Sequence, residues 1–184
     1  MELALVLPLA AFVILAAMFL LFVRRAGRLI ATTRDVERFR RQVSDLAARV
    51  EKSLAEVCGR VDSVRRGQLQ AADVADDLTA SLDAVDRYAE EGRGLKPPHD
   101  ADRIREGLVA ELERARRALE MVEHGCSIQA SARAGSRTLE AQTSIKRGYL
   151  NVLHAREAIA RLAAEATELV PTDPSHRKPA RRSA

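Results

Sequence analysis

The stretch VERFRRQVSDLAARVEKSLAEVCGRVDSV, residues 36–64, carries a valine at every seventh position. If these valines take position a of a heptad, position d is filled by Phe39 and Leu46. This is the seam of a coiled coil, and β-branched a residues favour two parallel strands. The stretch therefore predicts a long helix that could form a parallel homodimer. The predicted oligomer seam consists of Val36, Phe39, Val43, Leu46 and Val50.

The apolar face widens further along the same stretch. Position d becomes Ser53 and Arg60, while Leu54 and Val61 move the apolar residues to position e. A wider face is typical of a helix that is buried in a globular bundle. We therefore expect residues 24–50 to form a basic, coiled-coil-like stalk and residues 51–170 to form a helical bundle.

A run without any polar side chain, LALVLPLAAFVILAAMFLLFV, precedes the stalk at residues 3–23. A helix of this length reaches about 31 Å, which matches the hydrocarbon thickness of a bilayer. The heptad phase continues backwards through Leu29, Phe22 and Leu15, so a single N-terminal transmembrane helix continuous with the stalk is expected. The alternative is a cleavable signal peptide, which requires a basic segment before a shorter apolar core.

Three arginines follow the apolar run, and only two residues precede it. Arg24, Arg25 and Arg28 are expected at the membrane surface on the cytoplasmic side, because basic residues remain there. The protein is therefore predicted to be a single-pass protein of the cell membrane, with residues 1–2 as a short extracytoplasmic tail and the bulk of the chain in the cytoplasm. Cys58 and Cys126 should remain thiols in that reducing compartment.

Three further helices are expected after residue 66. The apolar spacing predicts them at about 69–91, from an N-cap at Asp100 to about Cys126, and at about 137–170. The sequence EGRGLKPPHD separates the first two, and a turn near Gly135 separates the last two. The soluble part is thus predicted to be all-α, a bundle of about four helices. Residues 171–184 are predicted to be a disordered basic tail.

Charge is divided along the chain. Residues 24–66 and 124–184 are basic, while residues 67–123 are acidic, and the whole chain carries a net charge of +4. Complementary charge between neighbouring helices would favour one packing arrangement, and the basic stalk and tail could hold the domain near anionic headgroups of the lipid bilayer. We do not expect a nucleic-acid partner, because acids interrupt the basic residues and no stacking aromatics accompany them.

No catalytic constellation is visible in the sequence. It contains no phosphate-binding loop, no dinucleotide fingerprint, no CxxC, no HExxH and no GxSxG. His124 and Cys126 lie two residues apart and would point about 200° away from each other on a helix, so they cannot share one metal ion. We therefore expect no enzyme activity, no metal site and no cofactor.

The stretch TSIKRGYLNVLHAREAIARL, residues 143–162, gathers reactive side chain types, but on different faces of one helix. Tyr149 belongs to the margin of the core stripe, whereas His154 lies on the opposite side. The leucines off the main stripe, amid positive charge, indicate a partner-binding face. The alternative is a helix buried on two sides within its own bundle. The predicted face comprises Lys146, Arg147, Leu150, Leu153, His154 and Arg161.

Together these features predict a membrane-anchored cytoplasmic scaffold or adaptor that acts by protein-protein interaction with a partner of unknown identity. One alternative is a membrane-linked signalling or stress module that switches stalk register or oligomer state. Another is an electrostatic binder of anionic lipid or nucleic acid through the stalk and tail.

Overall fold

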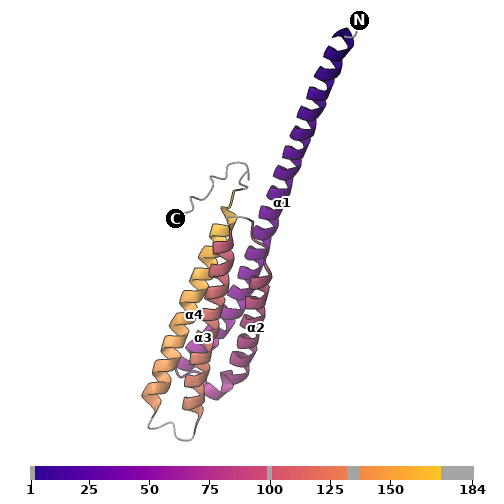
Figure 1. Cartoon of the computed structure of the whole chain (residues 1–184). Helices are drawn as coiled ribbons and strands as arrows, with labels where there is room; N and C mark the ends of the chain where they lie inside the picture. The colour runs from indigo at the N-terminus through magenta and orange to yellow at the C-terminus, as the bar shows by residue number, and fades with distance from the viewer. Residues whose placement is uncertain (1–2, 99–100, 132–136, 171–184) are drawn as a thin grey trace, which may run out of the picture. The chain divides into compact units, whose positions relative to one another are not determined.

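The computed structural model describes residues 3–98, 101–131 and 137–170, and within residues 3–32 it describes the side chains of Leu15, Met18, Phe19 and Leu20 only. Over that part the chain is helical and contains no strand, which confirms the all-α prediction. The elements are α1 (Leu3–Arg65), the short 3-10 helix η1 (Ala71–Val74), α2 (Ala75–Gly94), α3 (Asp102–Ala130) and α4 (Thr138–Thr167) (Figure 1).

Among the described residues, no helix is both long enough and apolar enough to cross a membrane. The structure therefore does not support the transmembrane anchor predicted at residues 3–23. Nearly all side chains of that run lie outside the described residues. Other predictions also fall outside the described residues or side chains. They concern Arg24, Arg25 and Arg28, the N-cap Asp100, the turn near Gly135 and the tail 171–184.

The chain divides into two compact units, one formed by Met1–Arg38 with Val170–Ala184 and the other by Phe39–Leu169. The second unit is a helical bundle, and its apolar side chains are buried from Phe39 onward.

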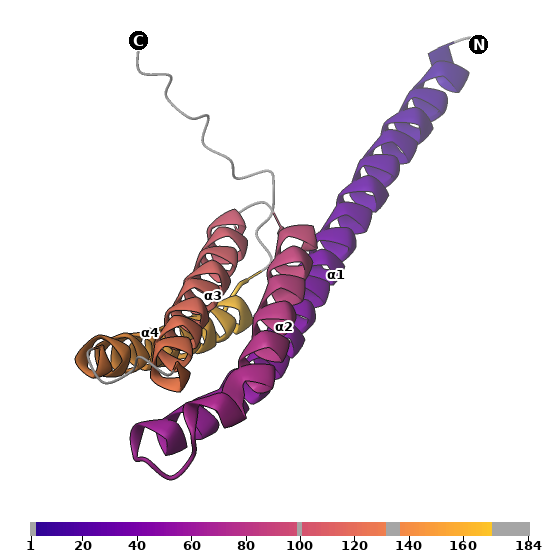
Figure 2. The same cartoon turned by 90° about the horizontal axis from the view of Figure 1, so that it is seen from below.

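Four helices close this second unit into an antiparallel ring. Ion pairs join Arg49 of α1 to Glu91 of α2 and Arg93 of α2 to Glu113 of α3. The helix α3 packs closely on α4, and Arg156 of α4 returns to α1. Each helix thus lies between two neighbours of opposite direction, in the order α1, α2, α3, α4, and α2 and α4 occupy opposite corners (Figures 1 and 2).

The valine series of α1 faces the inside of this bundle. Phe39, Val43, Leu46 and Val50 are fully buried, and so is Leu54 at position e. The side chains predicted to form an oligomer seam are therefore used within the chain, and a second copy could reach these four only if the bundle opened. Val36, which belongs to the other unit, is also buried. The remaining buried residues of this face are Ala47, Val57, Cys58, Val61 and Val64.

Two glycines allow α3 and α4 to approach each other closely. A Cβ atom on Gly125 of α3 would lie 2.8 Å from the carbonyl oxygen of Ala141, and one on Gly148 of α4 would lie 2.7 Å from that of Ala118. A helical glycine is unfavourable by roughly 0.5–1 kcal/mol relative to alanine, so these positions are explained by the backbone approach that they permit. The helix α3 accordingly continues through Gly125 to Ala130.

Glycine also does not end α2 where the sequence suggested. The helix continues through Gly92, which is buried beside Leu46 and Leu112, and ends at Gly94. Leu95 then adopts an extended conformation ahead of the two prolines. At the other end, η1 precedes α2, so the predicted helix 69–91 is a short 3-10 helix followed by an α-helix.

Candidate interaction surfaces

The described residues contain no group of three or more histidine, cysteine, aspartate or glutamate side chains that could hold a metal ion. His124 is exposed and Cys126 is buried, as their spacing predicts for neighbours on a helix. Burial raises the pKa of the Cys126 thiol to about 11 and also raises the pKa of Cys58, an effect that Arg156 opposes. Both thiols are therefore poor nucleophiles at neutral pH.

The predicted partner-binding residues lie on α4, and five of the six are exposed. Leu150 is 42% exposed although it lies in the middle of a packed helix. Leu153 is half-buried and packs against the core at the margin of this face. No ion pair engages Lys146 or Arg147 within the described part of the chain, whereas Arg161 lies 3.7 Å from Glu157 of the same helix. The exposed basic residues are Lys146, Arg147, His154 and Arg161.

The other residues of the 143–162 stretch bind the bundle together. The guanidinium of Arg65 lies 4.5 Å from the centre of the Tyr149 ring, so Tyr149 is a boundary residue as expected. Arg156 lies at the core margin and forms an ion pair with Glu51 of α1. The hydrogen bond between them raises the pKa of Arg156 and lowers the pKa of Glu51. These side chains position α4 on α1.

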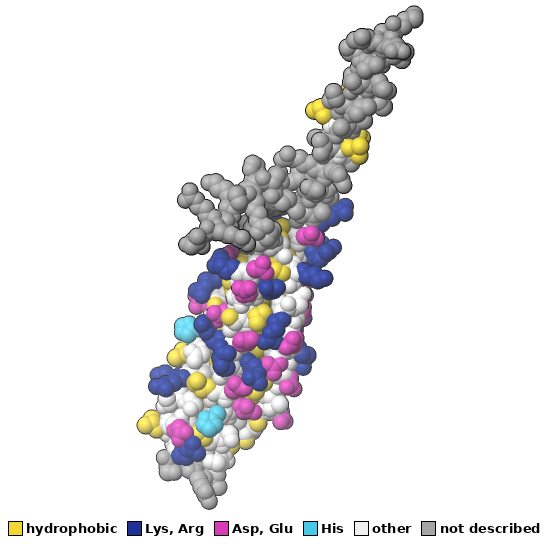
Figure 3. All heavy atoms as spheres, in the orientation of Figure 1, with side chains coloured by type: hydrophobic (Ala, Val, Ile, Leu, Met, Phe, Trp, Pro, Cys, Tyr) yellow, Lys and Arg dark blue, Asp and Glu magenta, His cyan; other side chains and the backbone are white. Residues whose placement is uncertain are grey.

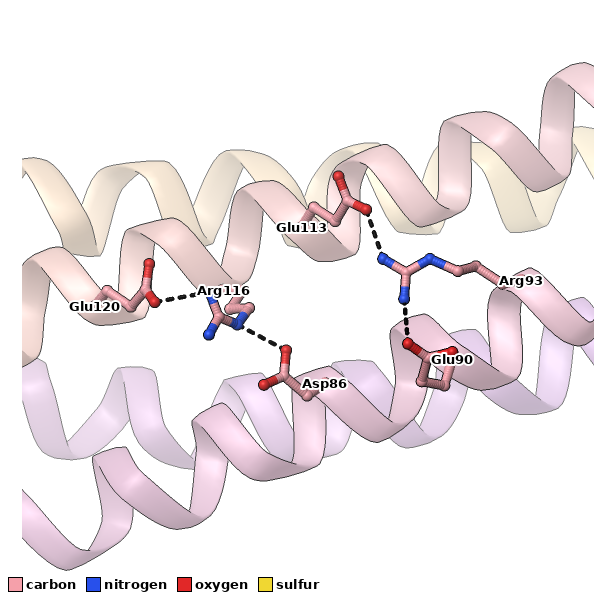
Figure 4. Close-up of polar contacts among 6 residues, drawn as sticks. All are labelled: Asp86, Glu90, Arg93, Glu113, Arg116 and Glu120. Carbon is pink, nitrogen blue, oxygen red and sulfur yellow. Dashed lines mark hydrogen bonds and ion pairs between the residues drawn. The ribbon is translucent and has the colours of Figure 1, made fainter.

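A ladder of charges lies between α2 and α3. Arg93 lies 2.5 Å from Glu90 and 2.7 Å from Glu113, so one guanidinium bridges two helices. Arg116 likewise lies 2.7 Å from Asp86 and 2.7 Å from Glu120 (Figure 4). The spacings 90/93 and 116/120 are visible in the sequence, but the partners on the facing helix are not.

The ladder borders a groove of about 300 Å³ whose floor includes Val85, Ala89 and Leu112. The ladder arginines Arg93 and Arg116 are paired with carboxylates, and each exposed pair contributes only about 0.2–1 kcal/mol. Arg117 also lines the groove, and it is exposed and engages no ion pair within the described residues. The ladder fixes how α2 and α3 are aligned. Further ion pairs, Arg49–Glu91 and Arg60–Asp77, join α1 to α2.

A second groove of about 250 Å³ runs between α1 and α4. Small side chains form most of it, with the Glu51–Arg156 pair in its wall. The small residues are Ser44, Ala47, Ala48, Ala160 and Ala163.

The outward face of α2 carries charges of both signs. Asp76, Asp83 and Arg87 are exposed, and within the described part of the chain no ion pair engages them. The space-filling view shows basic and acidic side chains interspersed over the bundle, with hydrophobic atoms scattered among them (Figure 3).

Comparison with protein-family models, with curated proteins and with solved structures finds no match to this chain.

Proposed function

We propose that the chain is a membrane-anchored helical scaffold that acts by protein-protein interaction and catalyses no reaction. In this proposal residues 3–23 hold the chain in the cell membrane, the bundle 39–169 lies in the cytoplasm, and the outward face of α4 binds a protein partner. The observation that carries the proposal is the exposure of Leu150 on a helix whose opposite side is already buried. Exposed apolar surface that is rimmed by polar side chains is one mark of an interaction site, and Leu150 lies beside the exposed Lys146, Arg147 and His154.

The membrane anchor in this proposal is supported by the sequence alone. Twenty-one consecutive residues without a polar side chain match the thickness of a bilayer, and the arginines that follow favour a cytoplasmic bundle. The test is alkaline extraction of membranes that contain the full chain, which should leave the protein in the pellet. The double variant Val13→Arg/Ala16→Arg should be released, because a central arginine costs about 2.5–3.5 kcal/mol. Release of the wild-type chain would overturn the anchor.

The binding face can be tested separately with a photo-crosslinking amino acid placed at Leu150 in intact cells. We expect discrete adducts with protein, and we expect the charge reversal Lys146→Glu to reduce them. The matched control is the same amino acid at Glu56, which is exposed on α1 and lies outside this face. Equal adduct yields at Leu150 and Glu56 would refute the assignment of this face.

A further inference from the structure

Two stripes on opposite corners of the bundle match each other in charge and spacing. The first, here called the α2 stripe, consists of Asp76, Ala80, Asp83, Arg87 and Glu90, all of them exposed. The second, the α4 stripe, consists of Lys146, Leu150, Leu153, Glu157 and Arg161. Both follow steps of four, three and four residues, and the last step is three residues in the α2 stripe and four in the α4 stripe. This is the spacing of one helix face.

Taken in order, the two stripes are complementary. Asp76 corresponds to Lys146, Arg87 to Glu157 and Glu90 to Arg161, so each of these charges meets its opposite. Between them, Ala80 corresponds to the exposed Leu150, and the small side chain leaves room for the leucine. Leu153 corresponds to Asp83, whose neighbour Ala84 is half-buried and offers an apolar contact beside it.

Most of these charges are available for a contact with another molecule, whereas Glu90 already pairs with Arg93 at 2.5 Å. No ion pair engages Asp76, Arg87 or Lys146 anywhere in the described part of the chain. Glu157 has only a 3.7 Å contact with Arg161, and both side chains are about 70% exposed, with values of 68% and 72%. Such a pair contributes little, so it can exchange partners at almost no cost.

The bundle also presents the two stripes in the same direction and at about the same height. The helices α2 and α4 are both antiparallel to α1, and they therefore run parallel to each other. Arg49 and Glu51, half a turn apart on α1, pair with Glu91 of α2 and Arg156 of α4. A second copy placed beside the first in the same orientation would thus bring its α2 stripe level with the α4 stripe.

We propose that copies of this chain assemble head to tail, with the α4 stripe of one copy on the α2 stripe of the next. This inference rests on the proposed function, because it names the partner of the α4 face. The contact is heterologous and its two halves lie at opposite corners, so it extends into a row instead of closing into a dimer. All copies in the row point the same way, which suits anchoring in one membrane.

Two symmetric arrangements compete with this one. A parallel contact between two α4 stripes would place Lys146 on Lys146 and Glu157 on Glu157, and these like charges repel. An antiparallel contact would pair Lys146 with Glu157 and Leu150 with Leu153, but it would point the two copies in opposite directions. Only the head-to-tail contact involves α2, and this difference decides the test.

The test uses full-length chains with different tags, reconstituted in the same membrane. One chain carries Ala80→Cys and the other carries Leu150→Cys, and an added oxidant joins cysteines that touch. Native Cys58 and Cys126 are buried, and chains that carry only these two cysteines give the background level of disulfide formation. We expect a disulfide between the two different chains, and none when either variant is present alone. A disulfide between two Leu150→Cys chains, without one between the different chains, would overturn the proposal in favour of the symmetric contact.

Charge reversal provides the specificity control. Asp76→Lys/Arg87→Glu on the chain with Ala80→Cys should reduce the yield about tenfold, because two attractions become repulsions. Adding Lys146→Asp/Glu157→Arg to the chain with Leu150→Cys should restore it. The control reversals Lys52→Glu/Glu56→Arg on α1 should change nothing. An unchanged yield after reversal of the α2 stripe would contradict the head-to-tail contact.

The outcome separates this inference from the proposed function. If the photo-crosslinker at Leu150 reaches other proteins in cells while Ala80→Cys and Leu150→Cys never join, the scaffold proposal stands and the self-assembly fails. If neither experiment gives a product, both fail.

Discussion

Replacing Gly148 by alanine should destabilise the bundle, whereas the same replacement at Gly59 should stabilise it. The new Cβ at position 148 would lie 2.6 Å from Cγ2 of Val122 and 2.7 Å from the carbonyl oxygen of Ala118. A carbonyl oxygen of a packed helix cannot move alone, so α3 and α4 must separate by several tenths of an ångström. A Cβ at Gly59 meets nothing within 4 Å.

The magnitude follows from two opposing effects. Alanine gains roughly 0.5–1 kcal/mol over glycine in a helix interior at either position. Overpacking at Gly148 costs about 1–3 kcal/mol, so Gly148→Ala should lose roughly 0–2.5 kcal/mol net, with a central value of about 1 kcal/mol. The difference between the two variants cancels the gain and isolates the clash, which should be about 1–3 kcal/mol.

The assay is urea unfolding of the full-length chain in mild detergent, followed by far-UV circular dichroism. With an m-value of about 1–3 kcal/mol/M, the two midpoints should differ by roughly 1 M. Equal midpoints, or a Gly148→Ala variant more stable than Gly59→Ala, would refute the close backbone contact between α3 and α4.

Three further predictions concern the core, one ion pair and the thiols. Phe39→Ala should cost about 3–5 kcal/mol in the same unfolding assay, because the ring is fully buried, and a loss below about 1 kcal/mol would mean that this face is not in the core. The lowered pKa of Glu51 contributes stability that is present above its unfolded value near 4.5 and is lost as the pH falls through the lower folded value, so acid titration should destabilise the wild type more than Glu51→Gln. An identical acid response of the two proteins would show that the Glu51–Arg156 pair is absent. Cys58 and Cys126 should react with a maleimide at pH 7 at least tenfold faster in urea than in the folded chain, and rapid labelling of the folded chain would contradict their burial.

The helical class and the buried face of α1 could be predicted from the valine series, but its partner could not. A heptad stripe packs equally well against a second copy or against other helices of the same chain. Phe39 and Leu46 would occupy position d of the heptad whether the stripe packs against a second copy or within the chain. Only the widening to Leu54 and Val61 indicated the bundle, and the structure extends that environment back to Phe39.

The sequence did not show which glycines end a helix and which lie at a contact between helices. Gly125 lies beside the predicted end of the third helix at about Cys126, yet α3 continues past it and touches α4 there. One signal could have identified the contact: alanine, a β-branched residue and glycine occur at the same spacing in both helices. The two triplets are Ala118, Val122, Gly125 and Ala141, Ile145, Gly148.

The candidate surface on α4 could be predicted from the sequence, because it depends on the geometry of one helix only. Helical geometry separates Leu150 from the core stripe before any tertiary contact is known. The α2 stripe could not be predicted from the acidic composition of residues 67–123, because that composition does not show which acids are paired. Which acids are free, such as Asp76, and which are paired, such as Asp86, depends on the facing helix.

The most direct test of the account is the rate at which a maleimide labels a cysteine at Leu150, compared in the purified, dilute chain and in native membranes. If the outward face of α4 is where the chain meets its partner, Leu150→Cys should react rapidly when the chain is dilute and several times more slowly in the membrane, while a cysteine at the exposed control Glu56 should react equally in both. Equal rates for Leu150→Cys in the two preparations would contradict the claim that this face binds a protein.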